Sequence, residues 1–273
     1  MLKLAFIGAG NMSSSMVAGL GATSDFGPVL MADRNQDKLD LLSERYQTET
    51  ASSNQDAAAR ADVLVLAVKP QGLRDLCLEI KQQVQEKRPL IISVAAGVTA
   101  EAIEHWLGGD LAIIRSMPNI PSKIQMGMTG LYANDQVSEA QKDVAELLCQ
   151  AIGEFVWLKK EHDMHALTAV SGSGPAYFFL FMEAMHKSAV SLGLESDKAL
   201  ALVVQTALGA AELVKAGDST PEELKESVMS PNGTTEQAIR SFEQDGLRAM
   251  VHQAMIACLR RSEAMAEELS SKE

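Results

Sequence analysis

The chain has 273 residues, and this length favours two domains, each with enough apolar side chains to form a core. Its formal net charge of −12 disfavours nucleic acid as a partner, and its three cysteines are too widely spaced for a disulfide framework or a metal site. We therefore expect reduced thiols and a cytoplasmic protein. The apolar N-terminal residues lack the pattern of a signal peptide, and the longest apolar run, residues 176–182, is too short to cross a membrane.

The N-terminal residues carry the first functional pattern. An apolar run over residues 2–7 ends at Gly8-Ala9-Gly10, and a helical pattern follows it. Gly8 suits the tight turn between a strand and a helix, and Gly10 allows the backbone to approach a pyrophosphate closely. Ser13 takes the place of the third glycine of this fingerprint. The pattern predicts a dinucleotide site, and the alternative is an ordinary strand–helix turn.

Strands and helices alternate over the rest of the first half. Apolar runs predict strands at 29–33, 62–68, 90–94 and 111–114, and amphipathic stretches predict helices at 36–46, 71–86 and 99–107. A further strand, helix and strand over 130–158 extend the edge of the sheet. The alternation predicts parallel βαβ units, and hence a Rossmann-type, doubly wound and mainly parallel sheet. We assign this α/β domain to residues 1–158 and expect it to bind NAD(P).

Residues 159–273 have the pattern of an all-α domain. Helices are predicted at 175–192, at 196–215, from 221 onward and at 246–269. The first half of the helix at 175–192 is apolar nearly all round, so this helix must be buried. We interpret its apolar surface as a subunit interface, with a monomer core as the alternative. The domain is therefore expected to form a dimer.

Three loops that follow predicted strands are candidates for cofactor binding, namely Ala67-Val68-Lys69-Pro70, Ala95-Ala96-Gly97 and Pro118-Asn119-Ile120-Pro121. Ligands bind beyond the carboxyl ends of parallel strands, so these loops lie along one rim. The small residues of the second loop leave room for a flat nicotinamide ring. Asp33, at another strand end, favours a free ribose 2′-hydroxyl, whereas Arg34 can pair with a 2′-phosphate. The choice between NADH and NADPH stays open on these residues.

Two polar loops lie in the helical domain. Residues 171–175 form a flexible turn at a helix start and lack the pattern of a nucleophile elbow. Residues 229–235 precede a helix with Glu236 in its first turn, and the free amides of such a helix can bind a small carboxylate. The alternative is a threonine N-cap beside a glutamate. His162 and His165 are three residues apart, and we interpret them as a solvated cluster rather than a metal site.

Six motifs follow one another along the chain. They are Ile7-Gly8-Ala9-Gly10-Asn11-Met12, Ala67-Val68-Lys69-Pro70, Ala95-Ala96-Gly97-Val98-Thr99, Met117-Pro118-Asn119, Val170-Ser171-Gly172-Ser173-Gly174-Pro175-Ala176-Tyr177 and Ser230-Pro231-Asn232-Gly233-Thr234-Thr235. This combination resembles the pyrroline-5-carboxylate reductase family over essentially the whole chain, and the last two motifs are the most specific. The chain departs from the family pattern at Ser13, at Ile120, where threonine is usual, and at Asn232 and Thr234.

The resemblance implies the last step of proline biosynthesis, in which NADPH or NADH reduces 1-pyrroline-5-carboxylate to L-proline, and family habit favours NADPH. It also implies dimers, often assembled into decamers, and no metal, membrane or nucleic-acid partner is expected. The motifs and the resemblance together assign cofactor binding to Ile7, Gly8, Ala9, Gly10, Asn11, Met12, Asp33, Arg34, Asn54, Ala67, Val68, Lys69, Pro70, Ala95, Ala96 and Gly97. The resemblance assigns substrate binding to Ser230, Gly233, Thr234 and Thr235.

Positioning dominates the expected chemistry, because a protonated cyclic imine already accepts hydride readily. We expect the nicotinamide to lie against residues 95–97 and the substrate carboxylate to bind amides after Gly233. Thr235 is the expected catalytic residue, hydrogen-bonded to the ring nitrogen, with the imine proton supplied by solvent.

Two rival functions remain open on the sequence. One is a β-hydroxyacid dehydrogenase, whose pattern has a lysine early on the helix after Pro175, where this chain has none before Lys187. The other is a non-catalytic NADP(H)-binding redox sensor, which has no need for residues 230–235.

Overall fold

The computed structural model describes residues 1–21 and 26–270. The chain divides into two compact units, one formed by Met1–Ser173 with Cys258–Glu273 and the other by Gly174–Ala257. The first is called the dinucleotide unit below and the second the helical unit. The division rests on compactness alone, and the functional boundary after residue 158 stays a prediction.

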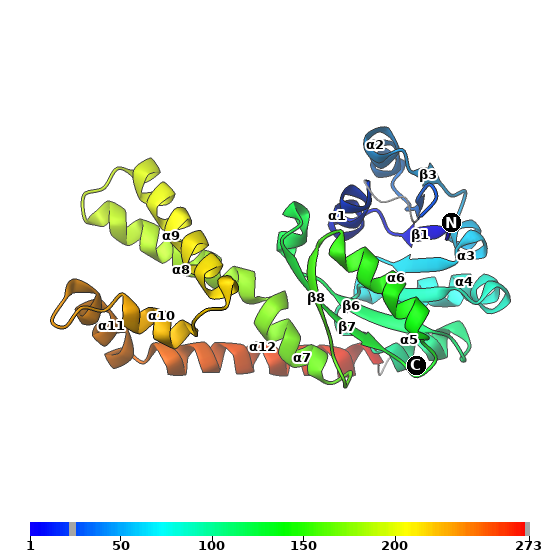
Figure 1. The fold of residues 1–273 in the computed structure, drawn as a ribbon. Coiled ribbons are helices and arrows are strands. Elements are labelled where there is room, and N and C mark those ends of the chain that lie inside the picture. The colour runs from blue at the N-terminus through cyan, green and yellow to red at the C-terminus, as the bar shows by residue number, and fades with distance from the viewer. Residues whose placement is uncertain (22–25, 271–273) are drawn as a thin grey trace. The chain divides into compact units, whose positions relative to one another are not determined.

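The dinucleotide unit is built on one eight-stranded sheet with the order β3-β2-β1-β4-β5-β6-β7-β8 (Figure 1). Its strands are β1 (Leu4–Ile7), β2 (Leu30–Ala32), β3 (Glu49–Thr50), β4 (Val63–Leu66), β5 (Leu90–Ser93), β6 (Ile113–Met117), β7 (Gly127–Ala133) and β8 (Gly153–Trp157). Strands β1 to β6 pair in parallel, β7 is antiparallel to β6, and β8 is parallel to β7. The predicted Rossmann-type, mainly parallel sheet is confirmed.

The strand order changes direction at β1. The chain runs from β1 outward to β2 and β3 and then returns to β4 on the other side of β1, with Ile7 in register with both Ala32 and Leu66. Such a reversal opens a crevice at the carboxyl ends of the two central strands, where doubly wound folds bind their ligands. The fold therefore places the Gly8 turn at the position where a dinucleotide is expected.

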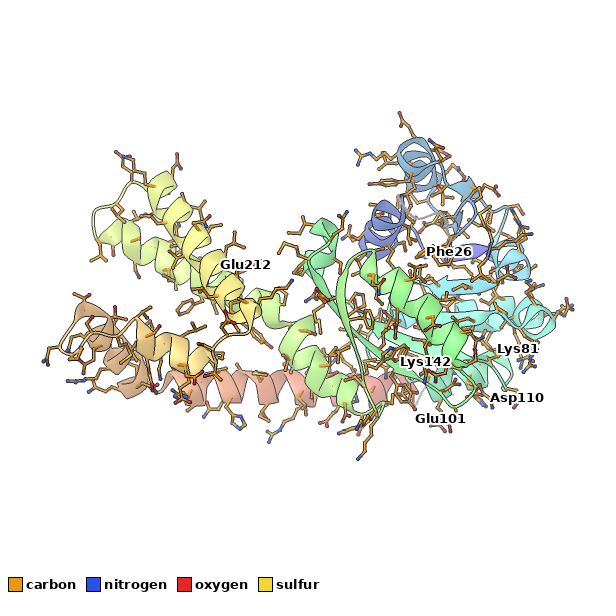
Figure 2. All side chains as sticks on the ribbon, in the orientation of Figure 1. Phe26, Lys81, Glu101, Asp110, Lys142 and Glu212 are labelled. Carbon is orange, nitrogen blue, oxygen red and sulfur yellow. The ribbon has the colours of Figure 1, made fainter. Side chains whose placement is uncertain are left out.

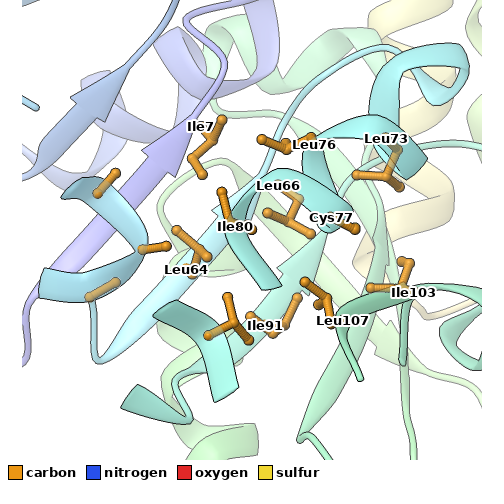
Figure 3. Packing of buried hydrophobic residues seen from close by; sticks show 14 of the residues in the cluster. Ile7, Leu64, Leu66, Leu73, Leu76, Cys77, Ile80, Ile91, Ile103 and Leu107 are labelled. Atoms are coloured by element: carbon orange, nitrogen blue, oxygen red, sulfur yellow. The ribbon is translucent and has the colours of Figure 1, made fainter. Parts of the chain in front are cut away.

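Helices cover both faces of this sheet. They are α1 (Asn11–Leu20), α2 (Gln36–Tyr46), α3 (Asn54–Arg60), α4 (Leu73–Lys87), α5 (Ala100–Leu107), α6 (Glu139–Gln150) and α7 (Asp163–Leu167). Side chains alternate along each strand, so Leu64 and Leu66 pack with α3, α4 and α5, whereas Val63 and Val65 pack with α1, α2 and α6. Figure 3 shows the first of these two cores, with Leu64 and Leu66 beside Ile80 of α4.

Several elements differ from the sequence-based expectation. The strand expected at 111–114 begins at Ile113 and ends at Met117, and the short elements β3, α3 and α7 were not predicted. Two 3-10 turns, Pro70–Gly72 and Ile120–Ile124, follow β4 and β6, and a π-helical turn, Thr168–Gly172, follows α7. These elements are too short or too irregular to leave a periodic pattern.

The helical unit contains α8 (Gly174–Ser191), α9 (Ser196–Ala216), α10 (Pro221–Ser227), α11 (Thr234–Gln244) and the first part of α12 (Leu247–Ser270). The monomer core considered as the alternative for α8 is wrong, because Phe178 and Leu180 are each 67% exposed in the single chain. Burial of this helix in a subunit interface stays a prediction. Leu202, Leu208 and Leu213 of α9 are exposed as well, and Figure 2 draws the side chains of this helix, with Glu212 labelled. Among the described residues, α9 alone is long and apolar enough to span a membrane, and only 11% of its most apolar window is buried.

Candidate active site

Gly8 forms a turn that no other residue fits. Its φ is +107°, and a Cβ atom at this position would lie 2.4 Å from the carbonyl oxygen of Ala67, which follows β4. The Gly8 amide donates to the carbonyl of Ala32 at 2.7 Å, so the turn is also fixed to the end of β2. Three neighbouring strands therefore hold this turn, and the absence of a side chain allows them to approach it.

Gly10 begins α1 as its N-cap, and no side chain caps the first amides of the helix. A Cβ at Gly10 would meet nothing within 4 Å, so the space above the helix start is open. Ser13 is fully buried and its hydroxyl donates to the carbonyl of Gly8 at 2.5 Å. The serine therefore holds the turn closed in place of the usual third glycine. Free amides beside open space suit the binding of a phosphate group.

Asp33 and Arg34 follow β2, and their side chains differ in their hydrogen-bond partners. The Asp33 carboxylate accepts from the amide of Ala9 at 2.6 Å and from the amide of Asn35 at 2.8 Å. Both of its oxygens are thus engaged by the backbone of the glycine turn and of the α2 start. Arg34 is exposed, and no hydrogen bond or ion pair holds its guanidinium among residues 1–21 and 26–270.

The loop after β4 lies next to the glycine turn. Ala67 donates its amide to the carbonyl of Ile7 at 2.8 Å, and Val68 packs against the core beneath the sheet. Lys69 is exposed, and Pro70 starts the following 3-10 turn. Asn54, in the first turn of α3, donates its side-chain amide to both carboxylate oxygens of Glu79 on α4 at 3.2 Å.

The loop after β5 turns sharply at Gly97, where φ is +77°. Ala95 and Val98 are buried, Ala96 is partly exposed, and Thr99 caps α5 by accepting from the amide of Ala102 at 3.1 Å. The loop thus presents only small side chains and backbone. It lies at the same sheet edge as the loops after β1, β2 and β4, because these strands are parallel neighbours.

The loop after β6 is fixed by Asn119. This buried side chain accepts from the amide of Met128 at 2.9 Å and donates to the carbonyl of Ser171 at 3.0 Å. Ile120, in the place of the usual threonine, is 47% exposed. Asn119 therefore connects β7 to the π-helical turn at Thr168–Gly172, a structural task that its position in the motif alone did not reveal.

The segment before α11 belongs to the helical unit and has its own geometry. Gly233 is the N-cap of α11 without a side-chain cap, so the threonine N-cap considered above is wrong, and Thr234 and Thr235 form the first helical turn. The amide of Gly233 donates to the carbonyl of Ser230 at 2.8 Å. Glu236 accepts from the amide of Asn232 at 2.5 Å. The first amides of α11 are therefore free to bind an anion.

Sequence reasoning missed one buried ion pair. Arg115 of β6 donates to Glu161 at 2.9 Å, and the same oxygen of Glu161 accepts from the amide of Ala100 at 2.6 Å. The Arg115 side chain is 7% exposed and the Glu161 side chain 23%. A lone charged residue, Arg115, in a strand without other charges was the available signal. Among the described residues, no group of three or more histidine, cysteine or acidic side chains could hold a metal ion.

Comparisons with known proteins agree with this geometry. A family model described as NADP oxidoreductase, coenzyme F420-dependent, matches residues 3–97, and one described as pyrroline-5-carboxylate reductase dimerisation matches residues 161–265. The pyrroline-5-carboxylate reductase of Pseudomonas aeruginosa is 43% identical over 268 residues, which cover 98% of each chain. A solved pyrroline-5-carboxylate reductase from Coxiella burnetii is 41% identical, with a TM-score of 0.92, over 97% of this chain and 98% of that one.

A third relative is the Plasmodium falciparum pyrroline carboxylate reductase, solved with NADP bound. It is 29% identical with a TM-score of 0.86 and covers 97% of this chain and 98% of its own. The similarity extends over both units and is not confined to the half that many oxidoreductases share. The chain therefore belongs to the pyrroline-5-carboxylate reductase family.

Proposed function

We propose that this protein reduces 1-pyrroline-5-carboxylate to L-proline with a nicotinamide cofactor, as the last step of proline biosynthesis. The observation that carries this proposal is similarity over the whole length to proteins named for this activity, including the segment at Ser230–Thr235. A redox sensor would need the dinucleotide unit but not the segment at residues 230–235. The three cysteines are free thiols, which suits a cytoplasmic enzyme.

The cofactor is proposed to bind at the rim formed by the loops after β1, β2, β4 and β5. Its pyrophosphate would lie over Gly10 and the free amides of α1, where the structure leaves open space. Asn54, Val68, Lys69 and Pro70 would complete the adenosine and phosphate contacts. The ring would lie against Ala95, Ala96 and Gly97, whose side chains are small enough to allow a flat group.

The state of Asp33 and Arg34 favours NADPH over NADH. Both oxygens of Asp33 already accept from backbone amides, so this carboxylate is less available to a ribose 2′-hydroxyl. The exposed Arg34 has no partner among the described residues and can pair with a 2′-phosphate. We expect kcat/KM to be higher with NADPH, and a higher value with NADH would contradict this preference.

The substrate carboxylate is proposed to bind the free amides at the start of α11, with support from the Ser230 hydroxyl. The Thr235 hydroxyl would hydrogen-bond the ring nitrogen and hold carbon C5 where hydride arrives. A bound NADPH would supply the hydride, C5 of the protonated imine would accept it, and the C=N π electrons would pass to the ring nitrogen. The proton on nitrogen comes from solvent before transfer, so the protein supplies positioning rather than an acid.

The exposed apolar faces of α8 and α9 are proposed to meet a second copy of the chain. These helices lie within the region that matches the dimerisation model. Exposed large apolar side chains on neighbouring helices mark an interaction surface, and a symmetric dimer buries the same patch on both copies. Assembly of such dimers into a decamer belongs to the same proposal, and sedimentation analysis measures it.

An assay of NADPH oxidation at 340 nm with 1-pyrroline-5-carboxylate tests the reaction. We expect turnover that depends on this imine, and no turnover at micromolar enzyme would reject the proposed function. Thr235→Ala should lower kcat with little change in NADPH affinity, and Thr235→Ser, which keeps the hydroxyl, is the matched control. Equal turnover in Thr235→Ala and the wild type would remove the role assigned to this hydroxyl.

A further inference from the structure

The last part of α12 belongs to the dinucleotide unit and packs with one face against other elements of that unit. This helix is continuous from Leu247 to Ser270, and its residues from Cys258 onward belong to that unit (Figure 1). Glu263 lies 3.8 Å from Nε2 of His162. Further residues of α12 that lie against other elements there are Cys258, Ser262, Met265, Ala266 and Leu269. Their spacing of three or four residues places them on a single side of the helix.

Two polar contacts fix the start of this face. The thiol of Cys258 donates to the hydroxyl of Ser173 at 3.2 Å, and Nδ1 of His165 on α7 lies 2.8 Å from the hydroxyl of Ser262. Burial lowers the pKa of His165, and the nearby Arg115 lowers it further. These contacts determine which side of the helix faces inward.

The end of the face lies on the loop proposed to support the nicotinamide. A Cβ atom at Gly97 would lie 3.3 Å from Cδ1 of Leu269, 3.6 Å from Cβ of Met265 and 3.9 Å from the amide nitrogen of Ala266. The Leu269 side chain packs against the same core cluster that contains Ala95. The last turns of α12 thus fill the space into which a side chain at Gly97 would project, and leave no room for one to move.

The residues after this loop are held independently. The amide of Ala100, at the start of α5, donates to Glu161, which is itself paired with Arg115. One end of the segment from Ala95 to Ala100 is therefore fixed by a buried ion pair, while the contact with Leu269 fixes its turn. Without Leu269, the turn at Gly97 would lose the apolar side chain that limits its movement.

We propose that Leu269 is a positioning residue for hydride transfer, acting through the backbone of the Ala95–Gly97 loop. The inference rests on the proposed function, because it takes that loop to support the nicotinamide ring. Leu269 sets the position of the loop, and the loop sets the position of the nicotinamide ring that donates the hydride. Small displacements at a reacting centre are costly in rate even when the mutated residue is remote.

The test compares Leu269→Ala with Glu267→Ala, an exposed position on the same helix that is not among the three nearest neighbours of Gly97. We expect kcat to fall by about tenfold in Leu269→Ala. The NADPH dissociation constant should change by less than about twofold, because other loops bind the phosphates. The deuterium isotope effect on kcat, measured with NADPH labelled at the transferred position, should rise as hydride transfer becomes slower. Leu269→Met, which conserves volume, should recover most of kcat.

The outcomes separate positioning from structural damage. An unchanged kcat in Leu269→Ala, an equal fall in Glu267→Ala, or a lower kcat with an unchanged isotope effect would each overturn the inference. If Leu269→Ala fails to fold, Leu269→Val removes the Cδ1 atom with a smaller loss of volume. An unchanged kcat in Leu269→Val would also overturn the inference. A wild-type protein without imine-dependent NADPH oxidation refutes the proposed function instead, so the two failures are distinguishable.

Discussion

Alanine substitution at the two glycines of the first turn should have opposite effects on stability and on cofactor binding. A Cβ at Gly8 would lie 2.4 Å from the Ala67 carbonyl oxygen, and φ at this residue is +107°. At Gly10, φ is −85° and a Cβ would meet nothing within 4 Å. We therefore expect Gly8→Ala to destabilise the fold and Gly10→Ala to spare it while obstructing a bound pyrophosphate.

The magnitudes follow from these contacts. A left-handed backbone costs a non-glycine residue about 1–2 kcal/mol, and a forced overlap in a packed region costs about 1–3 kcal/mol more. Gly8→Ala should therefore lose about 3 kcal/mol, which corresponds to a fall of about 6–12 °C in Tm for a domain of this size. Gly10→Ala replaces one N-cap residue by a poorer one and should cost less than about 1 kcal/mol. Its NADPH dissociation constant should rise by at least about tenfold.

Thermal denaturation followed by circular dichroism measures the first effect, and quenching of protein fluorescence by NADPH measures the second. The two variants serve as controls for each other, since each adds one methyl group to the same turn. A Gly8→Ala protein as stable as the wild type would refute the steric argument. Wild-type NADPH affinity in Gly10→Ala would refute the placement of the pyrophosphate at this turn.

Three further predictions concern charge and thiol chemistry. Glu161→Ala leaves the buried Arg115 guanidinium unpaired and should lower the free energy of unfolding by about 3 kcal/mol. Urea denaturation measures this loss, and a value below about 1 kcal/mol would contradict the account of the ion pair. Burial raises the pKa of Cys77 and Cys149 to about 12, so both thiols should resist iodoacetamide at pH 8 until the chain unfolds. Alkylation of either thiol in the native protein, measured by mass spectrometry, would contradict this prediction. Arg34→Ala should raise KM for NADPH and leave KM for NADH unchanged, and an equal rise for both cofactors would exclude pairing with the 2′-phosphate.

The sequence predicts most of the α/β fold because its strands are buried on both faces. Near-continuous apolar runs such as 63–66 and 90–93 mark such strands, and the intervening helices are amphipathic. Neither the two-residue strand β3 nor the antiparallel direction of β7 produces a recognisable apolar run in the sequence. Direction is set by which neighbour a strand pairs with, and a local pattern does not contain that information.

The geometry of the candidate site was likewise predictable from the sequence only in part. The glycine turn was predictable because the sharp turn after the first strand needs a residue without a side chain at Gly8, and the sequence shows that glycine directly. Other contacts of the site join residues that are far apart in the chain, so a local pattern does not show them. Examples are the hydrogen bond from the Ala9 amide to Asp33 and the position of Leu269 beside Gly97. For α8 the sequence left a monomer core open as an alternative, because periodicity shows that an apolar face needs a partner but does not show whether the same chain supplies it.

Transfer of a labelled hydride tests the central claim most directly. The purified protein would be incubated with 1-pyrroline-5-carboxylate and NADPH carrying deuterium at the transferred C4 position, and the product analysed by mass spectrometry and NMR. We predict L-proline with one deuterium at C5 and stoichiometric NADP⁺. Oxidation of NADPH without deuterated proline, or the absence of both, would contradict the assignment of this chain as a pyrroline-5-carboxylate reductase.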